Sequence, residues 1–109
     1  MAKTKKLTIE GLIEKIQSYN PSADLDLVRL AYDFAAEAHK GQMRKSGEPY
    51  IIHPLSAAHY LADLKIDPII ICATLLHDVP EDTPVTLEEI EKNFGSEIAS
   101  MVRGITKLG

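Results

Sequence analysis

The stretch ATLLHDVPEDT, residues 73–83, joins an apolar run to four side chains that can bind a metal or carry a proton. His77 and Asp78 end the apolar run, and Glu81 and Asp82 follow one helical turn later. Neutral imidazole and carboxylate are the ligands that a borderline divalent metal prefers. Such a metal generates hydroxide from bound water near neutral pH, and neighbouring acidic groups can orient that water or carry its proton.

A metal site needs further ligands, and His53 is the best candidate for a third one. It is expected to begin its own helix directly after a loop, where functional residues are common. A set of two histidines and one aspartate, without a thiolate, suits Mn²⁺ or Fe²⁺ as well as Zn²⁺.

A basic, glycine-containing loop, KGQMRKSGEPYI, precedes His53 and offers Lys40, Arg44 and Lys45. Arginine and lysine beside a metal indicate a substrate that carries phosphate groups. The combination is typical of a metal-dependent phosphohydrolase.

Each of these features also has an ordinary structural explanation. A His-Asp pair is common at a helix end, acidic residues after it are often solvated, and His53 could act as a cap. Taken singly, these explanations are favoured. Taken together, these explanations are less convincing, because charged groups beside a buried helix are unfavourable unless they are paired or coordinated.

Three further ring-bearing residues are given structural roles. His39 is expected near a helix end, and His59 on a partly exposed helix face. Tyr50 is expected to pack, although its place in the basic loop permits stacking on a base.

The apolar periodicity predicts helices throughout the chain and one all-α domain of five or six helices. Thr8, Asp67 and Thr86 are expected to cap helices, and Gly41 and Gly95 to end them. The helix after Asp67 is apolar on nearly every side, so it should be the central one and run to about residue 78. The segment VPEDTPV is expected to break it.

The composition limits the possible functions. The chain has 109 residues, 45% hydrophobic and 26% charged, which suits one globular domain. A net charge of −4 argues against a broad surface for duplex nucleic acid. The single cysteine, Cys72, excludes a disulfide within the chain and suits a reducing cytoplasm. The apolar run at residues 69–76 is too short to span a membrane.

Three stretches resemble the N-terminal hydrolase domain of the RelA/SpoT family, whose members make and destroy the alarmone (p)ppGpp. They are HKGQMRKSGEPYIIHP, LLHDVPEDT and VRGITKL, and the likeness runs from about Leu27 to the last residue. The resemblance implies an all-helical HD fold that binds Mn²⁺. It also implies hydrolysis of the 3′-pyrophosphate of ppGpp or pppGpp, which gives GDP or GTP and pyrophosphate.

The resemblance also assigns roles residue by residue. It implies that the metal ligands are His53, His77 and Asp78. It implies that the catalytic acidic pair is Glu81 and Asp82.

For the nucleotide-binding loop, the resemblance implies Arg44, Lys45, Ser46 and Tyr50. Pro80 stands where the family usually has an aliphatic residue, and it removes no functional group. The intact His-Asp and Glu-Asp pairs favour the degradative activity over the synthetic one.

The family's domain continues beyond this length, and a later helix supplies a fourth ligand, an aspartate, and an asparagine for the nucleotide. We therefore expect residues 1–109 to be the N-terminal part of an HD-type hydrolase domain, truncated on its C-terminal side. We expect the parent protein to be a hydrolase, and a bifunctional synthetase/hydrolase is the second possibility for it. A domain truncated in this way should expose apolar surface and self-associate. Two alternatives are an HD phosphohydrolase acting on another nucleotide and a catalytically dead helical module for binding or dimerisation.

Overall fold

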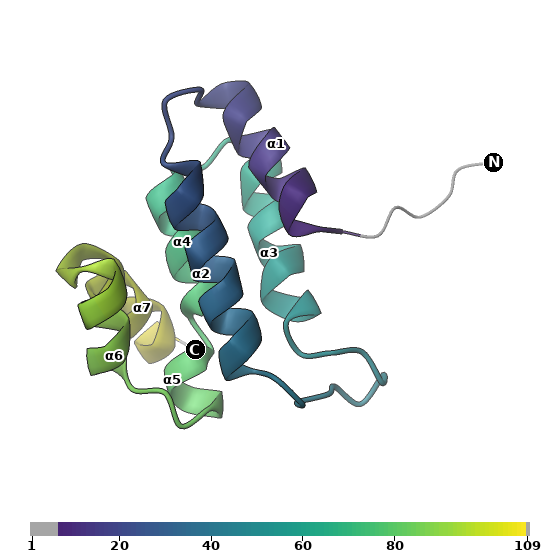
Figure 1. Ribbon diagram of the computed structural model, residues 1–109, viewed down its shortest axis with the longest axis vertical. Helices are drawn as coiled ribbons and strands as arrows, with labels where there is room; N and C mark the ends of the chain where they lie inside the picture. The colour runs from purple at the N-terminus through teal and green to yellow at the C-terminus, as the bar shows by residue number, and fades with distance from the viewer. Residues whose placement is uncertain (1–6, 109) are drawn as a thin grey trace.

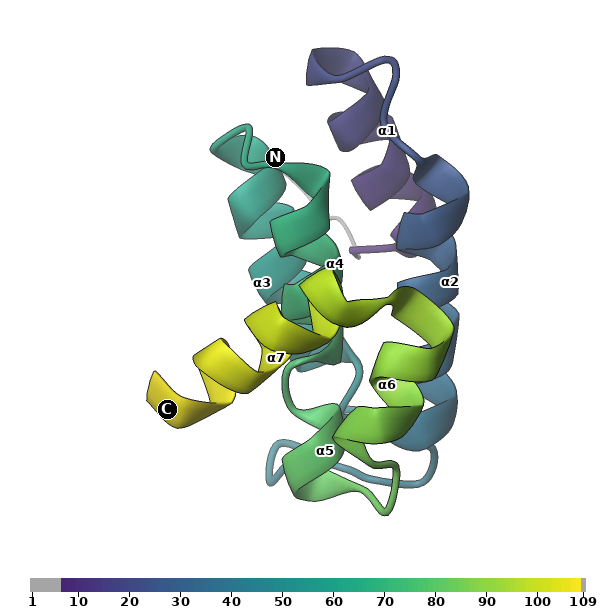
Figure 2. The same ribbon diagram turned by 90° about the vertical axis from the view of Figure 1, so that its left-hand side faces the viewer.

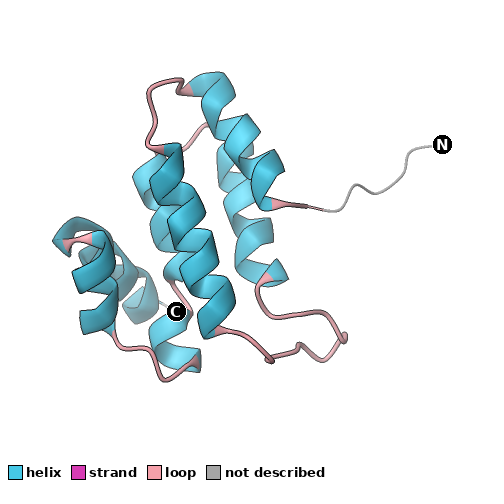
Figure 3. Cartoon of the chain, viewed as in Figure 1, coloured by secondary structure: helices cyan, strands magenta, loops and turns pink. Residues whose placement is uncertain are grey.

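The computed structural model describes residues 7–108, and side chains up to residue 105. Its helices are α1 (Ile9–Tyr19), α2 (Leu25–Ala38), α3 (Ile52–Asp63), α4 (Pro68–Leu76), α5 (Val79–Asp82), α6 (Leu87–Phe94) and α7 (Ser96–Leu108) (Figure 1). Within these residues there is no strand, as the colouring in Figure 3 shows. The predicted all-α class is confirmed.

Four helices begin at a side chain that accepts a hydrogen bond from a backbone N–H of the first turn. The capping residues are Thr8, Asp24, Asp67 and Thr86. Each supplies an acceptor to an N–H group that has no partner within the helix. At α6 the side chain of Glu89 also accepts from the Thr86 backbone N–H, which completes a capping box. The caps predicted at Thr8, Asp67 and Thr86 are therefore confirmed.

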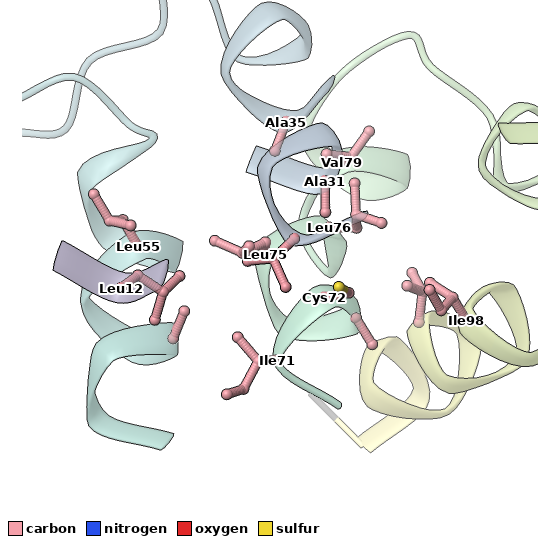
Figure 4. Close-up of a cluster of buried hydrophobic side chains, with 14 of the residues drawn as sticks. Leu12, Ala31, Ala35, Leu55, Ile71, Cys72, Leu75, Leu76, Val79 and Ile98 are labelled. Carbon is pink, nitrogen blue, oxygen red and sulfur yellow. The ribbon is translucent and has the colours of Figure 1, made fainter. Parts of the chain in front are cut away.

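Helix α4 is the centre of the domain, as predicted. It packs against α2, α3 and α7, and every residue from Ile71 to Leu76 is buried. In Figure 4, Ile71 and Leu75 point toward Leu12 and Leu55, whereas Ile98 lies on the other side of α4. From Ile71 onward the helix has no solvated face, which explains its nearly uniform apolar sequence, while Ile70 in its first turn is 40% exposed.

The remaining helices form two groups around α4. Helix α1 packs on α2 and α3, while α6 packs on α7 (Figures 1 and 2). The ring of Phe34 in α2 meets that of Phe94 in α6 edge to face, with 5.3 Å between centroids. Within the described residues, none of the helices combines the length and apolar character needed to cross a membrane.

Three local predictions need correction. Helix α4 ends at Leu76, slightly before the expected residue 78, and His77 is its C-cap. The segment expected to be a break contains the one-turn helix α5, because Pro80 sits in a first turn, where its missing N–H is harmless. His59 is only 4% exposed instead of partly exposed, because α1 packs on α3, and its Nε2 lies 2.8 Å from the carbonyl oxygen of Thr8, the N-cap of α1.

Candidate active site

One end of the domain gathers most of the residues singled out above. The C-terminal ends of α2 and α4, the start of α3, the α2–α3 loop and α5 all lie at the lower end in Figures 1 and 2. The buried part of α4 fixes this end, because α2, α3 and α7 all pack against it.

His77 and Asp78 form an adjacent pair where α4 ends. The His77 Nδ1 lies 2.6 Å from the Thr74 carbonyl oxygen, which can only accept, so Nδ1 carries the proton of that bond. The other ring nitrogen, Nε2, lies 3.2 Å from Oδ1 of Asp78. The side chains are 22% and 17% exposed, so both groups are largely shielded from water.

Tyr50 links this pair to α5. Its hydroxyl lies 3.0 Å from Oδ2 of Asp78 and 2.8 Å from Oδ2 of Asp82. Burial raises the pKa of the Tyr50 hydroxyl far above its ordinary value, and the hydrogen bonds to Asp82 and Asp78 raise it further. Tyr50 therefore remains a neutral donor at physiological pH.

Two residues without a predicted chemical role hold this arrangement in place. His39, the C-cap of α2, is 2% exposed, and its ring stacks on Tyr50 with 4.6 Å between centroids. Its Nδ1 lies 2.9 Å from Oε1 of Gln42, whose amide nitrogen donates to the backbone carbonyl of Asp82. His39 is near a helix end, as predicted, but it also supports the site. In the sequence, the signal for this supporting role was the position of His39 three residues before Gln42.

The basic loop is a compact turn. Arg44 N donates to Glu48 O at 2.9 Å, and Gly47 N donates to Arg44 O at 2.8 Å. Gly47 has a φ of 90°, which glycine adopts without the steric penalty that a side chain would bring. Tyr50 N closes the loop by donating to Gln42 O at 2.9 Å. The loop is therefore shaped by its own backbone.

This loop surrounds a shallow hollow of about 460 Å³. Its lining residues are Met43, Arg44, Lys45, Ser46 and Tyr50. The four predicted nucleotide-binding residues thus share one hollow. Because Tyr50 also contacts Asp78 and Asp82, the hollow adjoins the acidic side of the site.

Two predicted residues are placed less closely. His53 is exposed in the first turn of α3, and its ring meets Tyr50 edge to face with 6.0 Å between centroids. Glu81 is exposed on α5. Among the described residues, no three His, Cys, Asp or Glu side chains are arranged to hold a metal together. The assignment of His53 as the third ligand therefore stays a prediction.

The pair itself fits a cation. His77 Nε2 and Asp78 Oδ1 are both able to donate electrons, and their 3.2 Å separation is favourable when a positive charge lies on or beside them. The bond from Nδ1 to the Thr74 carbonyl fixes the ring in the orientation that histidine ligands usually have. This donor set suits a divalent metal.

Comparison with known proteins agrees with the fold and the site. The HD domain family matches residues 31–109. The chain therefore belongs to the HD domain family. A hydrolase domain of this family implies a divalent metal.

Curated relatives confirm the resemblance to the RelA/SpoT family. The chain is 50% identical to the GTP pyrophosphokinase of Myxococcus xanthus over 85% of its length. It is 48% identical to the guanosine-3′,5′-bis(diphosphate) 3′-pyrophosphohydrolase of Aquifex aeolicus over 100% of its length. It is also 48% identical to the bifunctional (p)ppGpp synthase/hydrolase SpoT of Escherichia coli over 91% of its length. The chain spans only 12% to 16% of the length of these relatives.

Proposed function

We propose that residues 1–109 are the N-terminal part of an HD-type (p)ppGpp hydrolase domain that acts in the cytoplasm. The observation that carries this proposal is the position of Tyr50. Its ring lines the basic hollow, and its hydroxyl contacts one carboxylate beside His77 and one on α5. Tyr50 therefore contacts both the groups proposed to bind phosphate and the groups proposed to bind the metal, which supports the proposal.

The proposed reaction is hydrolysis of the bond between the ribose 3′-oxygen and the adjacent phosphorus of ppGpp or pppGpp. Water supplies a hydroxyl group to the phosphorus and a proton to the leaving 3′-oxygen, so the products are GDP or GTP and pyrophosphate. Arg44 and Lys45 are proposed to bind phosphate oxygens, with Ser46 and Tyr50 beside the nucleoside. Glu81 and Asp82 are proposed to accept the proton of the attacking water.

The proposed metal is Mn²⁺, held by His77 and Asp78 with His53 as a further ligand. When bound, such an ion would lower the pKa of water and neutralise charge on the phosphates. The proposed ligand set consists of nitrogen and oxygen donors and includes no thiolate, which is compatible with Mn²⁺.

The test is release of pyrophosphate from ppGpp by the purified chain with Mn²⁺, beside a His77→Ala variant. We expect release by the unaltered chain and none by the variant. GTP, ATP and dGTP in parallel assays test selectivity, and faster hydrolysis of one of them would point to another nucleotide as substrate. If ppGpp binds without any release, a binding module becomes the better description of this chain.

A further inference from the structure

A single phenol lies between two carboxylates at the two ends of α5, because Asp78 is the N-cap of this helix and Asp82 is its last residue. The Tyr50 hydroxyl is 3.0 Å from Asp78 and 2.8 Å from Asp82. A tyrosine hydroxyl has only one proton, so it can donate to one carboxylate at a time. The other carboxylate then faces a lone pair of the hydroxyl oxygen, which is unfavourable unless its charge is compensated.

The two carboxylates differ in what compensates them. The second oxygen of Asp78 lies 3.2 Å from His77 Nε2, in a position where a cation can neutralise the charge of Asp78. Asp82 is exposed on α5, and its backbone carbonyl is held by Gln42. A cation beside Asp78 therefore favours donation of the Tyr50 proton to Asp82. Conversely, removing the charge of Asp82 leaves the proton for Asp78.

The ring of Tyr50 cannot easily move toward one of the two carboxylates and away from the other. One face of the ring stacks on the buried His39, with an interplanar angle of 27°. The Tyr50 backbone N–H is bonded to Gln42 O at 2.9 Å. Because both the ring and the backbone are fixed, the choice between the carboxylates is made by the proton rather than by movement of the side chain.

We propose that Tyr50 is a positioning residue that couples Asp78 to Asp82 through its one shared hydroxyl proton. The coupling is a property of the metal-free chain, whereas its use in catalysis rests on the function proposed above. It gives Tyr50 a role beyond the nucleotide binding predicted for it. When a cation occupies the metal side, the Tyr50 hydroxyl would orient the Asp82 carboxylate by donating its hydrogen bond to it.

Thermal unfolding in EDTA tests the coupling without any metal or substrate. Asp78→Asn, Asp82→Asn and the double variant are compared in the unaltered chain and in the Tyr50→Phe background. We expect the non-additivity of the two midpoint shifts to differ between the backgrounds by about 3 °C. Phenylalanine keeps the ring on His39, so the fold is retained. Equal non-additivity in both backgrounds would overturn the proposal.

A matched control uses Tyr60, which is exposed on α3 at 64%. Tyr60→Phe also removes a phenolic hydroxyl, but one that is hydrogen-bonded to neither Asp78 nor Asp82. The non-additivity measured in the Tyr60→Phe background should equal that of the unaltered chain. A change as large as that of Tyr50→Phe would mean that the effect is a general loss of stability, which also contradicts the coupling.

Calorimetric Mn²⁺ binding provides the second readout. We expect Asp82→Asn to lower the Mn²⁺ affinity by about tenfold when Tyr50 is present, because the Tyr50 proton then goes to Asp78. The loss should be much smaller in the Tyr50→Phe background. Equal changes in both backgrounds would contradict the coupling. A chain that binds no Mn²⁺ would contradict the proposed metal function, while the unfolding cycle would still decide the role of Tyr50.

Discussion

The side-chain amide of Gln42 donates a hydrogen bond to the backbone carbonyl of Asp82. These residues are 40 positions apart, and their contact ties the α2–α3 loop to the short helix α5. A one-turn helix has little stability of its own, so it depends on tertiary contacts of this kind.

Gln42→Ala is expected to loosen α5, because a lost hydrogen bond costs about 1 kcal/mol. The measurement is hydrogen exchange at the backbone amides of Asp82 and Thr83, which bond to Asp78 O and Val79 O within this turn. Both amides should exchange several times faster. Gln17→Ala, at an exposed position on α1, should leave them unchanged. Unchanged exchange in Gln42→Ala would show that α5 is held by other contacts.

Arg44→Ala is expected to weaken ppGpp binding by about tenfold or more, because hydrogen bonds to charged groups contribute about 1.5–3 kcal/mol. The shape of the loop should survive, since its turn is formed by backbone bonds of Arg44 and Gly47. Calorimetry at two salt concentrations measures the loss of ppGpp affinity. The affinity of the variant should depend less steeply on salt than that of the unaltered chain. Lys92→Ala on α6 is the matched control, and an equal loss there would contradict a specific phosphate site.

Mn²⁺ is expected to raise the unfolding midpoint, and EDTA to reverse the rise, because a ligand that binds only the folded state stabilises it. At a Mn²⁺ concentration about 100 times the Kd, the gain is about 2.7 kcal/mol. His77→Ala and Asp78→Asn should remove the rise, and His53→Ala should reduce it. Asp33→Asn, on an exposed part of α2, is the control. A full rise in His53→Ala would exclude His53 as a ligand.

Leu75→Ala is expected to lower the free energy of unfolding by about 2–5 kcal/mol, because Leu75 is fully buried at the centre of the core. Urea unfolding followed by circular dichroism measures the loss. Ile70→Ala lies on the same helix but is 40% exposed, so its effect should be clearly smaller. Similar losses for the two variants would contradict the central position of α4.

The stability of the fold is expected to fall at alkaline pH. Burial raises the pKa of the Cys72 thiol from 9.0 to about 12. Between these values the unfolded chain loses the thiol proton while the folded chain keeps it, so stability decreases as pH rises. The raised pKa values of Tyr19 and Tyr32 act in the same direction above pH 10.

Urea unfolding at pH 8 and pH 10.5 measures this decrease, and Cys72→Ala should show a smaller one. The native thiol should also resist a disulfide reagent at pH 8 and react once urea unfolds the chain. Rapid reaction of the native thiol would contradict its burial.

Local signals in the sequence were sufficient for most of the fold. Thr8, Asp67 and Thr86 cap their own helices through bonds within three residues, so the chain near each of them contains the information. The enclosed position of α4 follows from its uniformly apolar composition. The helix α5 was missed because Pro80 suggests a break, although proline is well suited to a first helical turn.

The parts that failed or stayed open depend on distant contacts. The burial of His59 depends on Thr8, which lies 51 residues earlier. The bonds from Tyr50 to Asp78 and Asp82 join residues 28 and 32 positions apart. No periodicity or spacing rule identifies such partners. The adjacent pair of His77 and Asp78, in contrast, was evident from the sequence because neighbours at a helix end remain close.

The backbone of the segment from Gln42 to Tyr50 closes on itself, because the N–H groups of Arg44, Gly47 and Tyr50 all donate to carbonyl oxygens inside the segment. The side-chain bonds from this segment to Asp78 and Asp82 come from its two end residues, Gln42 and Tyr50. A homologous or designed segment that keeps these two ends could therefore replace residues 43–49 without disturbing α4 or α5. Under the function proposed above, exchange of this segment should change which phosphorylated compound the domain binds while the histidine and aspartate at the end of α4 stay the same.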